Sequence, residues 1–338
     1  MTLDSFWYRS HPARWLLWPL GLLYFAITVV RRVLYRYRWL RSVQLPVPVI
    51  VVGNITVGGT GKTPLVIWLV EQLRARGWVP GIVSRGYGGN SPHWPREVKA
   101  DSDPAAVGDE PVLLVQRLNC PVMVGPKRVE SAQRLLAGHD VDIIVSDDGL
   151  QHYALRRDIE IAVVDGLRGL GNGLPLPAGP LREPVSRLDV VDLLVVNGGA
   201  AGDGLRMDLI PEAVVRLDGS ESRTLAAFAG KLVHALAGIG HPERFFDSLR
   251  HAGVQVLPHA FPDHHRFKAE DMEFPDNLDV VMTEKDAVKC RLFPGPRHWY
   301  LVVRASLEPT AGTRLDTVLR RLPEVTTRSG EGHGQETA

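Results

Sequence analysis

The sequence contains only two cysteines, Cys120 and Cys290, which lie far apart and form no CxxC pair. This scarcity argues against a disulfide framework and against a cysteine zinc site, and it favours a reducing compartment. The chain also lacks an excess of charge, because 39 Lys and Arg stand against 38 Asp and Glu, a net charge of +1. A general nucleic-acid-binding surface is therefore not expected.

No compositional bias points to a disordered or fibrous protein, since 45% of the 338 residues are hydrophobic and 23% are charged. At roughly 150 residues per domain, this length predicts about two domains. No internal repeat is evident. Residues 323–338 contain almost nothing to bury and are predicted to form a disordered tail.

The first 45 residues carry seven arginines and one acidic residue, a local net charge of +6. Within them, Trp15–Val30 has no charged side chain, is bracketed by arginines and has Trp and Tyr near both ends. This composition predicts a membrane-associated helix within residues 1–45. We favour a helix lying in the membrane interface over a span, because a span needs about 20 apolar residues and Pro19 and Gly21 weaken the helix.

The run RRVLYRYR that follows this segment contains no small-residue cleavage site, so the helix is expected to be retained and not removed as a signal peptide. In a span, the heavier arginine flank on the C-terminal side would keep the rest of the chain cytoplasmic. A buried helix of a soluble domain is the remaining alternative, and the flanking Arg, Trp and Tyr fit it less well.

Beyond residue 45, short β-branched runs alternate with helical stretches. This alternation predicts an α/β fold with a mostly parallel sheet covered by helices on both faces. The expected strands are 47–52, 81–84, 121–125, 141–146, 159–164 and 191–196, with helices over 63–76, after 111 and over 127–137. After a glycine-rich turn at 198–204, further strands are expected at 234–239, 278–286 and 299–303, with helices at 243–253 and 313–321. We therefore expect a core domain at 46–200 and a smaller α/β domain at 201–322.

A glycine-rich loop follows the first expected strand and precedes a helix. Such a loop closes backbone N–H groups around phosphate oxygens, while Lys62 would neutralise the β and γ phosphates and Thr63 would hold Mg²⁺. The pattern GxxxxGK[ST] requires a glycine where Thr56 stands, so the match is incomplete at one end, and a turn with a chance Lys-Thr is the alternative interpretation. The predicted nucleotide-binding residues are Gly58, Gly59, Thr60, Gly61, Lys62 and Thr63.

Two acidic residues, Asp147 and Asp148, directly follow the apolar run 141–146. A carboxylate at that position would lie at the carboxyl edge of the sheet, beside the nucleotide, where it organises Mg²⁺. An ordinary Asp-Asp-Gly turn is the alternative. The pairing with the phosphate loop favours a metal role, so Thr63, Asp147 and Asp148 are the predicted Mg²⁺ residues.

Several less common strings accompany these motifs in the order GGTGKTP, SRGYGG (84–89), GDEP (108–111), DDGLQH (147–152), LPLPAGPLREP (174–184), FPDHHRF (261–267) and TEKD (283–286). Together they resemble the tetraacyldisaccharide 4'-kinase family of lipid A biosynthesis over nearly the whole chain. The resemblance implies a P-loop enzyme on the cytoplasmic face of the inner membrane of a Gram-negative bacterium. It would transfer the γ-phosphate of ATP to the 4'-hydroxyl of a lipid-linked tetraacyl glucosamine disaccharide 1-phosphate, forming lipid IVA, with no obligate protein partner.

The GDEP motif offers the candidate base for this reaction. Read alone, it looks like a helix start with an acid near the cap and Pro111 in the first turn. The resemblance instead implies that Asp109 accepts the proton of the hydroxyl. A neighbouring histidine would support so weak a base, and alignment with the family's DH pair favours His264 over His265. A metal site at Asp263-His264-His265 is the alternative, but no i, i+4 pair or thiol accompanies it.

The other motifs supply the expected substrate and support residues. Arg182 would clamp phosphate in bidentate fashion, and Glu183 would hold Arg182 or the nucleotide ribose, although an ordinary surface ion pair is the alternative. Arg85 and Tyr87 would contact the anionic sugar phosphate, or they only fill a glycine loop. The remaining expected support residues are Glu110, Gln151 and His152, and TEKD (283–286) is interpreted as nucleotide contact or interdomain packing.

A function of another class fits part of the pattern. Membrane-bound nucleotide switches of the deviant-Walker type also carry GGxGKT after a strand and a membrane-seeking helix. Their loop usually has a second lysine just before the paired glycines, where this chain has Val57. That difference counts against the switch. A partner-stimulated ATPase activity without an acceptor would favour it.

Overall fold

The computed structural model describes residues 3–8 and 14–322. The tail predicted at 323–338 lies outside the described residues. Within them, the helices are α1 (Leu3–Tyr8), α2 (Arg14–Arg36), α3 (Lys62–Arg74), α4 (Pro104–Val107), α5 (Asp109–Leu118), α6 (Arg128–Gly138), α7 (Pro242–His251), α8 (Glu284–Cys290) and α9 (Ala311–Leu319). Short 3₁₀ segments, among them Val185–Val190, lie between these elements.

One mixed sheet connects the strands of the described chain, in the order β11-β10-β12-β13-β8-β7-β6-β1-β5-β2-β4-β3, with β9 beside β8. The strands are β1 (Val49–Gly53), β2 (Pro80–Ser84), β3 (Arg96–Val98), β4 (Val122–Val124), β5 (Ile143–Asp147), β6 (Ile159–Asp165), β7 (Leu193–Asn197), β8 (Leu205–Arg216), β9 (Ser222–Arg223), β10 (Leu232–Ala237), β11 (Gln255–Ala260), β12 (Asp279–Thr283) and β13 (His298–Leu307). The pairs from β4 through β2, β5, β1 and β6 to β7 are parallel. The predicted α/β class with a mostly parallel sheet is confirmed.

Both faces of the lower part of the sheet are covered, as expected from its continuous apolar strands. In β1, Ile50 and Val52 pack in one buried cluster with Leu69 of α3. The alternate residues Val49 and Val51 pack in a second cluster, on the α6 side. Because successive side chains of a strand point to opposite faces, this split places α3 and α6 on opposite sides of the sheet.

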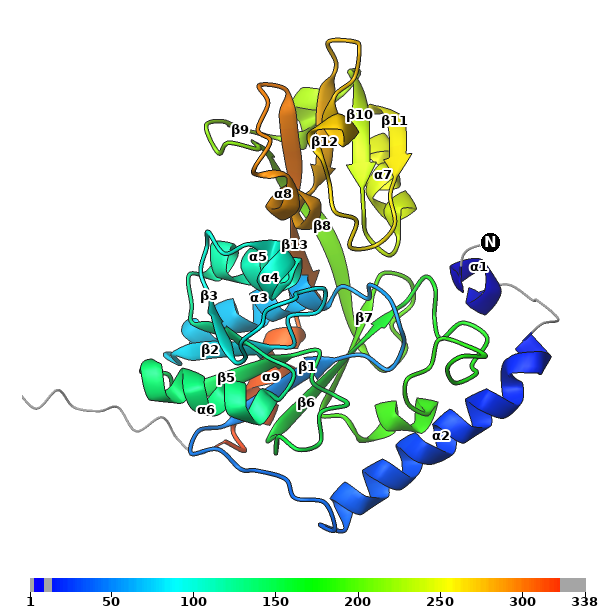
Figure 1. Cartoon of the computed structure of the whole chain (residues 1–338), viewed down its shortest axis with the longest axis vertical. Helices are drawn as coiled ribbons and strands as arrows, with labels where there is room; N and C mark the ends of the chain where they lie inside the picture. Colours follow the sequence, from blue (N-terminus) through cyan, green and yellow to red (C-terminus); the bar gives the residue numbers. More distant parts are fainter. Residues whose placement is uncertain (1–2, 9–13, 323–338) are drawn as a thin grey trace, which may run out of the picture.

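The long strands β8 and β13 form an antiparallel ribbon that joins this lower part to an upper part made of β10, β11, β12, α7 and α8 (Figure 1). The upper part has its own buried cluster, which includes Phe246 and Trp299. The domain boundaries expected at 45, 200 and 322 stay predictions. Leu315 of α9 packs in the same cluster as Leu69, so the last helix of the expected second domain lies against the lower part.

Residues 284–286, expected in a strand, instead begin helix α8. The side chain of Thr283 accepts a hydrogen bond from the backbone N–H of Asp286 and caps the helix there, which ends β12 at residue 283.

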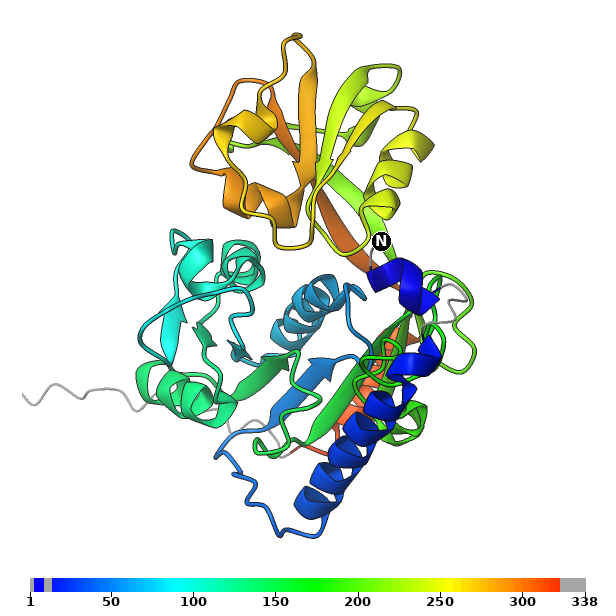
Figure 2. The same ribbon diagram turned by 45° about the vertical axis from the view of Figure 1, so that its right-hand side comes forward.

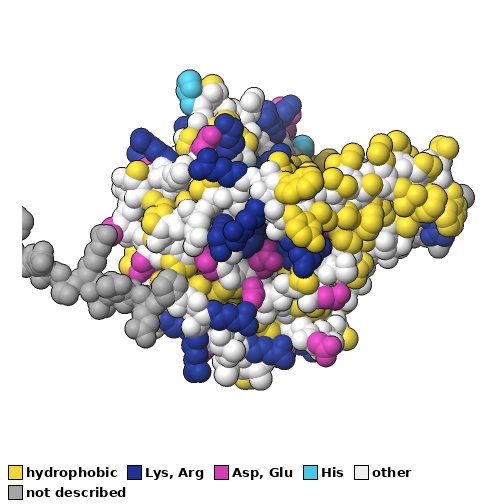
Figure 3. All heavy atoms as spheres, turned by 90° about the horizontal axis from the view of Figure 1, so that it is seen from below, with side chains coloured by type: hydrophobic (Ala, Val, Ile, Leu, Met, Phe, Trp, Pro, Cys, Tyr) yellow, Lys and Arg dark blue, Asp and Glu magenta, His cyan; other side chains and the backbone are white. Residues whose placement is uncertain are grey.

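Helix α2 lies along the outside of the lower part (Figures 1 and 2). It runs unbroken through Pro19 and is long and apolar enough to cross a membrane, by length and composition. Gly21 is its buried residue, where a Cβ would lie 3.2 Å from the carbonyl oxygen of Pro175. Seen from below, apolar side chains cover the projecting helix (Figure 3); the most exposed include Trp15, Leu16, Leu23 and Ile27.

Candidate active site

The phosphate loop connects β1 to α3, and Lys62 and Thr63 form the first turn of that helix. Gly61 adopts a left-handed conformation with φ of 91°, and a Cβ there would lie 2.3 Å from the Asn197 side-chain nitrogen. Two asparagines hold the loop, since Asn54 donates to the Thr60 hydroxyl at 3.3 Å and Asn197 donates to the Thr60 carbonyl at 3.0 Å. The helix N-terminus and these fixed backbone groups form an anion-binding cradle.

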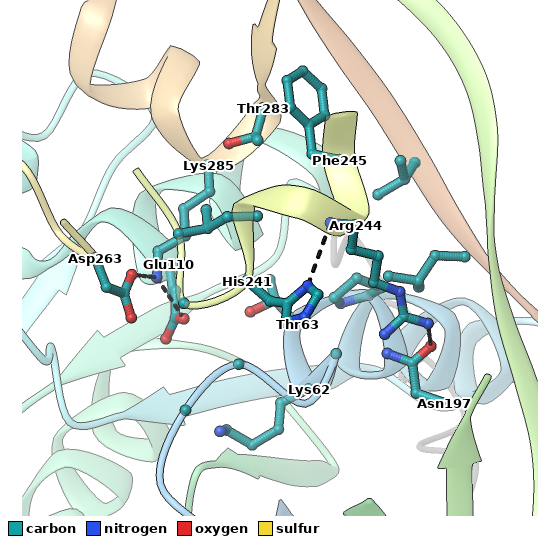
Figure 4. Close-up of a pocket in the computed structure, with 18 of the residues that line it drawn as sticks. Lys62, Thr63, Glu110, Asn197, His241, Arg244, Phe245, Asp263, Thr283 and Lys285 are labelled. Carbon is teal, nitrogen blue, oxygen red and sulfur yellow. Dashed lines mark hydrogen bonds and ion pairs between the residues drawn. The ribbon is translucent and has the colours of Figure 1, made fainter. Parts of the chain in front are cut away.

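A cavity of about 450 Å³ lies between this loop and the upper part of the molecule (Figure 4). Its floor includes Gly59, Lys62 and Thr63, and its opposite wall includes Arg244 and Phe245 of α7. Lys285, which follows β12, faces the same cavity and lies between Glu110 and Asp263. The cavity is therefore formed by segments from both parts of the chain.

The two predicted metal carboxylates have different surroundings. Asp147, the last residue of β5, is 1% exposed, and its Oδ2 accepts a hydrogen bond from Ser84 Oγ at 3.2 Å. Among the described residues its Oδ1 has no hydrogen-bond partner. Burial, with the nearby carboxylates of Glu110 and Asp148, raises the pKa of Asp147 well above its usual range.

Asp148 instead forms ion pairs with Lys62 at 3.5 Å and with Arg182 at 3.1 Å. Burial alone would raise the pKa of Asp148, but these two cations outweigh it and lower the value to about 2. The carboxylate is therefore ionised and ties the phosphate-loop lysine to the Arg182 loop.

Asp109 and His264 come together although 155 positions separate them. Asp109 begins α5 and is 4% exposed, and its Oδ2 lies 3.1 Å from His264 Nδ1. Burial opposes ionisation, but the hydrogen bond from His264 and the charge of Lys285 lower the pKa of Asp109 to about 2. The same hydrogen bond raises the pKa of His264. Among the described residues, His264 lines the cavity, and the buried Asp109 lies directly beside it.

Comparison with known proteins identifies the family to which the chain belongs. A family model described as "Tetraacyldisaccharide-1-P 4'-kinase" matches residues 13–320. The chain belongs to the tetraacyldisaccharide 4'-kinase family. The protein named "Tetraacyldisaccharide 4'-kinase" from Alkalilimnicola ehrlichii is 53% identical over 330 residues, 96% of this chain and 99% of that one. Its counterpart in Nitrosococcus oceani is 48% identical over 94% of each chain.

A solved structure supports the same assignment. The crystal structure of LpxK from Aquifex aeolicus in complex with ATP matches with a TM-score of 0.75 and 28% identity, over 91% of this chain and 98% of that one. The activity implied by the sequence motifs is therefore confirmed: the protein is a tetraacyldisaccharide 4'-kinase (EC 2.7.1.130) of lipid A biosynthesis. Family membership favours this enzyme over the nucleotide switch.

The histidine next to His264 has different partners in the kinase. His265 Nε2 lies 3.0 Å from Asp271, and its ring stacks on Phe261 with centroids 4.7 Å apart. Tyr87, by contrast, packs against the His264 ring at 4.9 Å and lines the cavity. The structure therefore brings His264 to Asp109, with Tyr87 against the His264 ring, and places His265 in a separate contact.

Glu183 differs from expectation, because within the described chain its side chain forms no ion pair with Arg182 and it is not among the residues that line the cavity. It is 4% exposed and accepts hydrogen bonds from Tyr153 Oη at 2.5 Å and Gln151 Nε2 at 2.9 Å, beside Arg187 at 3.4 Å. The side chains of neighbouring residues point in different directions, so Arg182 reaches Asp148 while Glu183 turns inward. Glu183 thus fixes the loop.

Four other expected support residues stand in different surroundings. Glu110 lines the cavity, whereas Arg85, Gln151 and His152 are not among its described lining residues. Gln151 donates to the carbonyl of Asn54 at 3.0 Å and so braces the start of the phosphate loop. Burial, followed by nearby arginines of which Arg128 is the strongest, lowers the pKa of His152 to about 4.

The sequence interpretation missed residues that the structure brings to the site. Arg128 is 3% exposed, and its Nε has no hydrogen-bond partner among the described residues. Asn197 ends β7 beside the phosphate loop, and Arg244 of α7 donates to it at 2.8 Å. The position of Asn197 at the carboxyl end of a parallel strand was an available signal, whereas a buried arginine leaves none in a single sequence.

The residues near the loop fit a magnesium ion. Among residues 3–8 and 14–322, no group of three or more His, Cys, Asp or Glu side chains is arranged to hold a metal ion. Mg²⁺ in phosphoryl-transfer sites needs no such group, because one or two protein oxygens share it with phosphate oxygens and water. The Thr63 side chain lines the cavity and offers one suitable oxygen ligand. The unpaired, buried Oδ1 of Asp147 is a second, although Asp147 is not among the described lining residues.

Proposed function

We propose that the kinase binds Mg²⁺-ATP on the loop Gly58–Thr63 and transfers its γ-phosphate to the 4'-hydroxyl of the lipid-linked disaccharide 1-phosphate. The relative from Aquifex aeolicus is described in complex with ATP. Lys62 would neutralise the β and γ phosphates, and Thr63 and Asp147 would hold Mg²⁺, with Asp148 beside them. An ion held by these residues would supply positive charge that offsets the negative charge of the transferring phosphate.

The proton of the hydroxyl passes to the Asp109–His264 pair, with Asp109 as the accepting carboxylate. The observation that carries this proposal is the 3.1 Å contact between the two side chains at the wall of the cavity that contains Lys62. A carboxylate with a pKa of about 2 is a weak base. Phosphoryl transfer passes through a loose transition state, however, in which positioning and charge neutralisation matter most. His264 orients the carboxylate and keeps it ionised.

Arg85 and Arg128 supply the positive charge that the sugar phosphate of the substrate requires. Together with Arg31 of α2 and Arg157 they lower the pKa of His152, so these four cations lie around one imidazole. Guanidinium groups bind phosphate in bidentate geometry. The buried Arg128, whose Nε is unpaired within the described chain, is the member already held in place.

The kinase acts at the cytoplasmic face of the inner membrane, with α2 lying in the interface. The apolar outer side of α2 supports this placement (Figure 3). Its inner side contacts the loop that carries Arg182, because Tyr24 Oη donates to the Arg182 carbonyl at 3.3 Å. A lipid substrate that follows α2 therefore arrives beside the cavity.

The test is transfer of label from γ-labelled ATP to the disaccharide 1-phosphate lipid by the full chain in detergent, followed by thin-layer chromatography. We expect labelled lipid with the wild type and none with Lys62→Ala or Asp109→Ala. Arg76→Gln is the matched control, because Arg76 forms its ion pair with Asp316 of α9, away from the cavity. Release of phosphate without labelled lipid would contradict the proposal and support the nucleotide switch.

A further inference from the structure

The Asp109–His264 pair is assembled from two parts of the chain. Asp109 begins α5 in the lower part, whereas His264 follows β11 in the upper part. The 3.1 Å contact between them therefore depends on how the upper part is held against α5. What holds it there has a direct effect on the reacting geometry, since small displacements of a catalytic group are costly.

Helix α8 of the upper part packs on α5, and several ion pairs join the two helices, of which the two shortest involve Arg117 and Lys285. Arg117 Nη1 of α5 lies 2.9 and 3.2 Å from the two carboxylate oxygens of Glu284. Lys285 Nζ lies 3.2 Å from Glu110 Oε1. The Arg117 and Glu284 side chains are only 19% and 11% exposed, so solvent screens their attraction little.

The two pairs fix one register of α8 on α5. Glu110 and Arg117 are seven residues apart, which places them on the same face of α5, about 10 Å apart along its axis. Glu284 and Lys285 are consecutive residues of α8 with opposite charges, and they pair with Arg117 and Glu110, respectively. A slide of α8 along α5 would separate both pairs, and a slide that brought Glu284 to Glu110 would place like charges together.

The first turn of α8 also contacts the residues next to Asp109 and His264 in the sequence. Lys285 Nζ lies 3.4 Å from Asp263, the residue before His264, and 3.9 Å from Asp109 itself. The turn is rigid, because the fully buried Asp286 accepts hydrogen bonds from Thr283 Oγ1 at 2.6 Å and from the Gly238 N–H at 2.9 Å. A shift of this turn would move both members of the pair.

We propose that the Arg117–Glu284 ion pair sets the position of α8 on α5 and thereby the distance between Asp109 and His264. Arg117 is thus a positioning residue for phosphoryl transfer, acting through Glu284 from outside the cavity. The inference rests on the proposed roles of Asp109 and His264. It gives the TEKD segment a definite role, in which Glu284 and Lys285 clamp the two parts and Thr283 and Asp286 shape the turn.

A charge exchange tests this inference. Glu212 also lies 3.3 Å from Arg117 and would repel a carboxylate at that position, so all variants carry Glu212→Gln. We expect Arg117→Glu and Glu284→Arg each to lower kcat for lipid phosphorylation by about 10- to 100-fold, with the KM for ATP changed less than about threefold. The double variant, which restores an ion pair in reversed orientation, should recover kcat to within about fivefold of the Glu212→Gln parent.

The NMR titration of the His264 ring supplies a readout that general destabilisation would not move. In the parent, the contact with Asp109 raises the pKa of His264. Each single exchange should lower that pKa towards its ordinary value, and the double exchange should raise it again. Arg76→Gln, which breaks an ion pair of 2.6 Å elsewhere, should leave both kcat and the His264 pKa unchanged.

The inference is overturned if the single variants keep the parent's kcat, or if the folded double variant stays as impaired as the singles. Where a charge exchange prevents folding, Glu284→Gln replaces it, and an unchanged kcat and His264 pKa there would also overturn the inference. Asp109→Ala separates the two hypotheses. If it retains kcat, the proposed base is wrong; if it abolishes kcat while the exchanges have no effect, only the positioning role fails.

Discussion

Replacing Gly61 with alanine tests whether the phosphate loop is held in one conformation before any nucleotide binds. Gly61 has a φ of 91°, a region that L-amino acids with a Cβ rarely adopt. Its Cβ would lie 2.3 Å from Asn197 Nδ2 and 3.2 Å from Met207 Cε, so the Asn197 side chain would have to move. That amide donates to the Thr60 carbonyl and accepts from Arg244.

The cost follows from these contacts. The left-handed backbone costs about 1 kcal/mol for alanine relative to glycine. Displacing Asn197 breaks two hydrogen bonds, at about 1 kcal/mol each. The free energy of unfolding should therefore fall by about 3 kcal/mol. With an unfolding entropy of roughly 2 cal/mol/K per residue over this chain, Tm falls by about 4 °C.

Thermal unfolding of the nucleotide-free kinase, followed by near-UV circular dichroism, measures this shift. Substitutions at two other glycines separate the backbone cost from the cost of displacing Asn197. Gly77→Ala has a φ of 85° with no atom within 4 Å of the new Cβ, so it isolates the backbone cost and should lower Tm by about 1 °C. At Gly59 a new Cβ has no atom within 4 Å and the backbone is not left-handed, so Gly59→Ala should leave Tm unchanged. Equal shifts for Gly61→Ala and Gly77→Ala would refute the argument that Asn197 holds the loop.

Three further predictions concern other parts of the kinase. Because contact with Asp109 raises the pKa of His264, the imidazolium stabilises the fold below pH 6.5, and this contribution disappears as the pH rises through the raised pKa. His264→Gln should therefore lower the free energy of unfolding in urea more at pH 6 than at pH 9. An equal loss at both pH values would contradict an ion pair between His264 and Asp109. Tyr153→Phe removes the hydrogen bond to the buried Glu183 and should lower the unfolding free energy by about 2 kcal/mol with an unchanged KM for ATP, since neither residue is among the described residues that line the cavity; a raised KM would show that Glu183 reaches the nucleotide. Leu16→Ser with Leu23→Ser should weaken sedimentation with anionic vesicles by about 100-fold or more without lowering Tm, because both side chains are exposed; unchanged sedimentation would exclude them from the lipid contact.

The parallel part of the sheet was predictable because its strands are buried on both faces and read as short, continuous apolar runs. The ribbon that joins the two parts was harder to find. Strand β8 was not predicted, since its exposure is irregular and it contains Pro211, which usually argues against a strand. In the structure Pro211 lies at a register shift opposite Val303, where a strand tolerates proline.

The candidate site, like the fold, could be predicted from the sequence only in part. The position of motif residues such as Lys62 and Asp147 at the carboxyl edge of the sheet could be predicted, because each motif directly follows an apolar strand, whereas their roles stay predictions. The inward direction of Glu183 could not, because its partners are recognisable only after the loop has folded. The Arg117–Glu284 pair joins residues 167 positions apart, and no local pattern connects them.

The connection between membrane and phosphate loop rests on contacts that local sequence does not show. Helix α2 touches the 174–184 loop at Gly21 and Tyr24. That loop in turn adjoins the phosphate loop, because the Arg182 N–H donates to the Ile55 carbonyl at 2.7 Å. The Arg182 guanidinium forms an ion pair with Asp148, which also forms an ion pair with Lys62. Lipid-facing and phosphate-facing surfaces are thus separated by a single loop, so under the proposed function a headgroup can reach the reacting phosphate while its acyl chains remain beside α2.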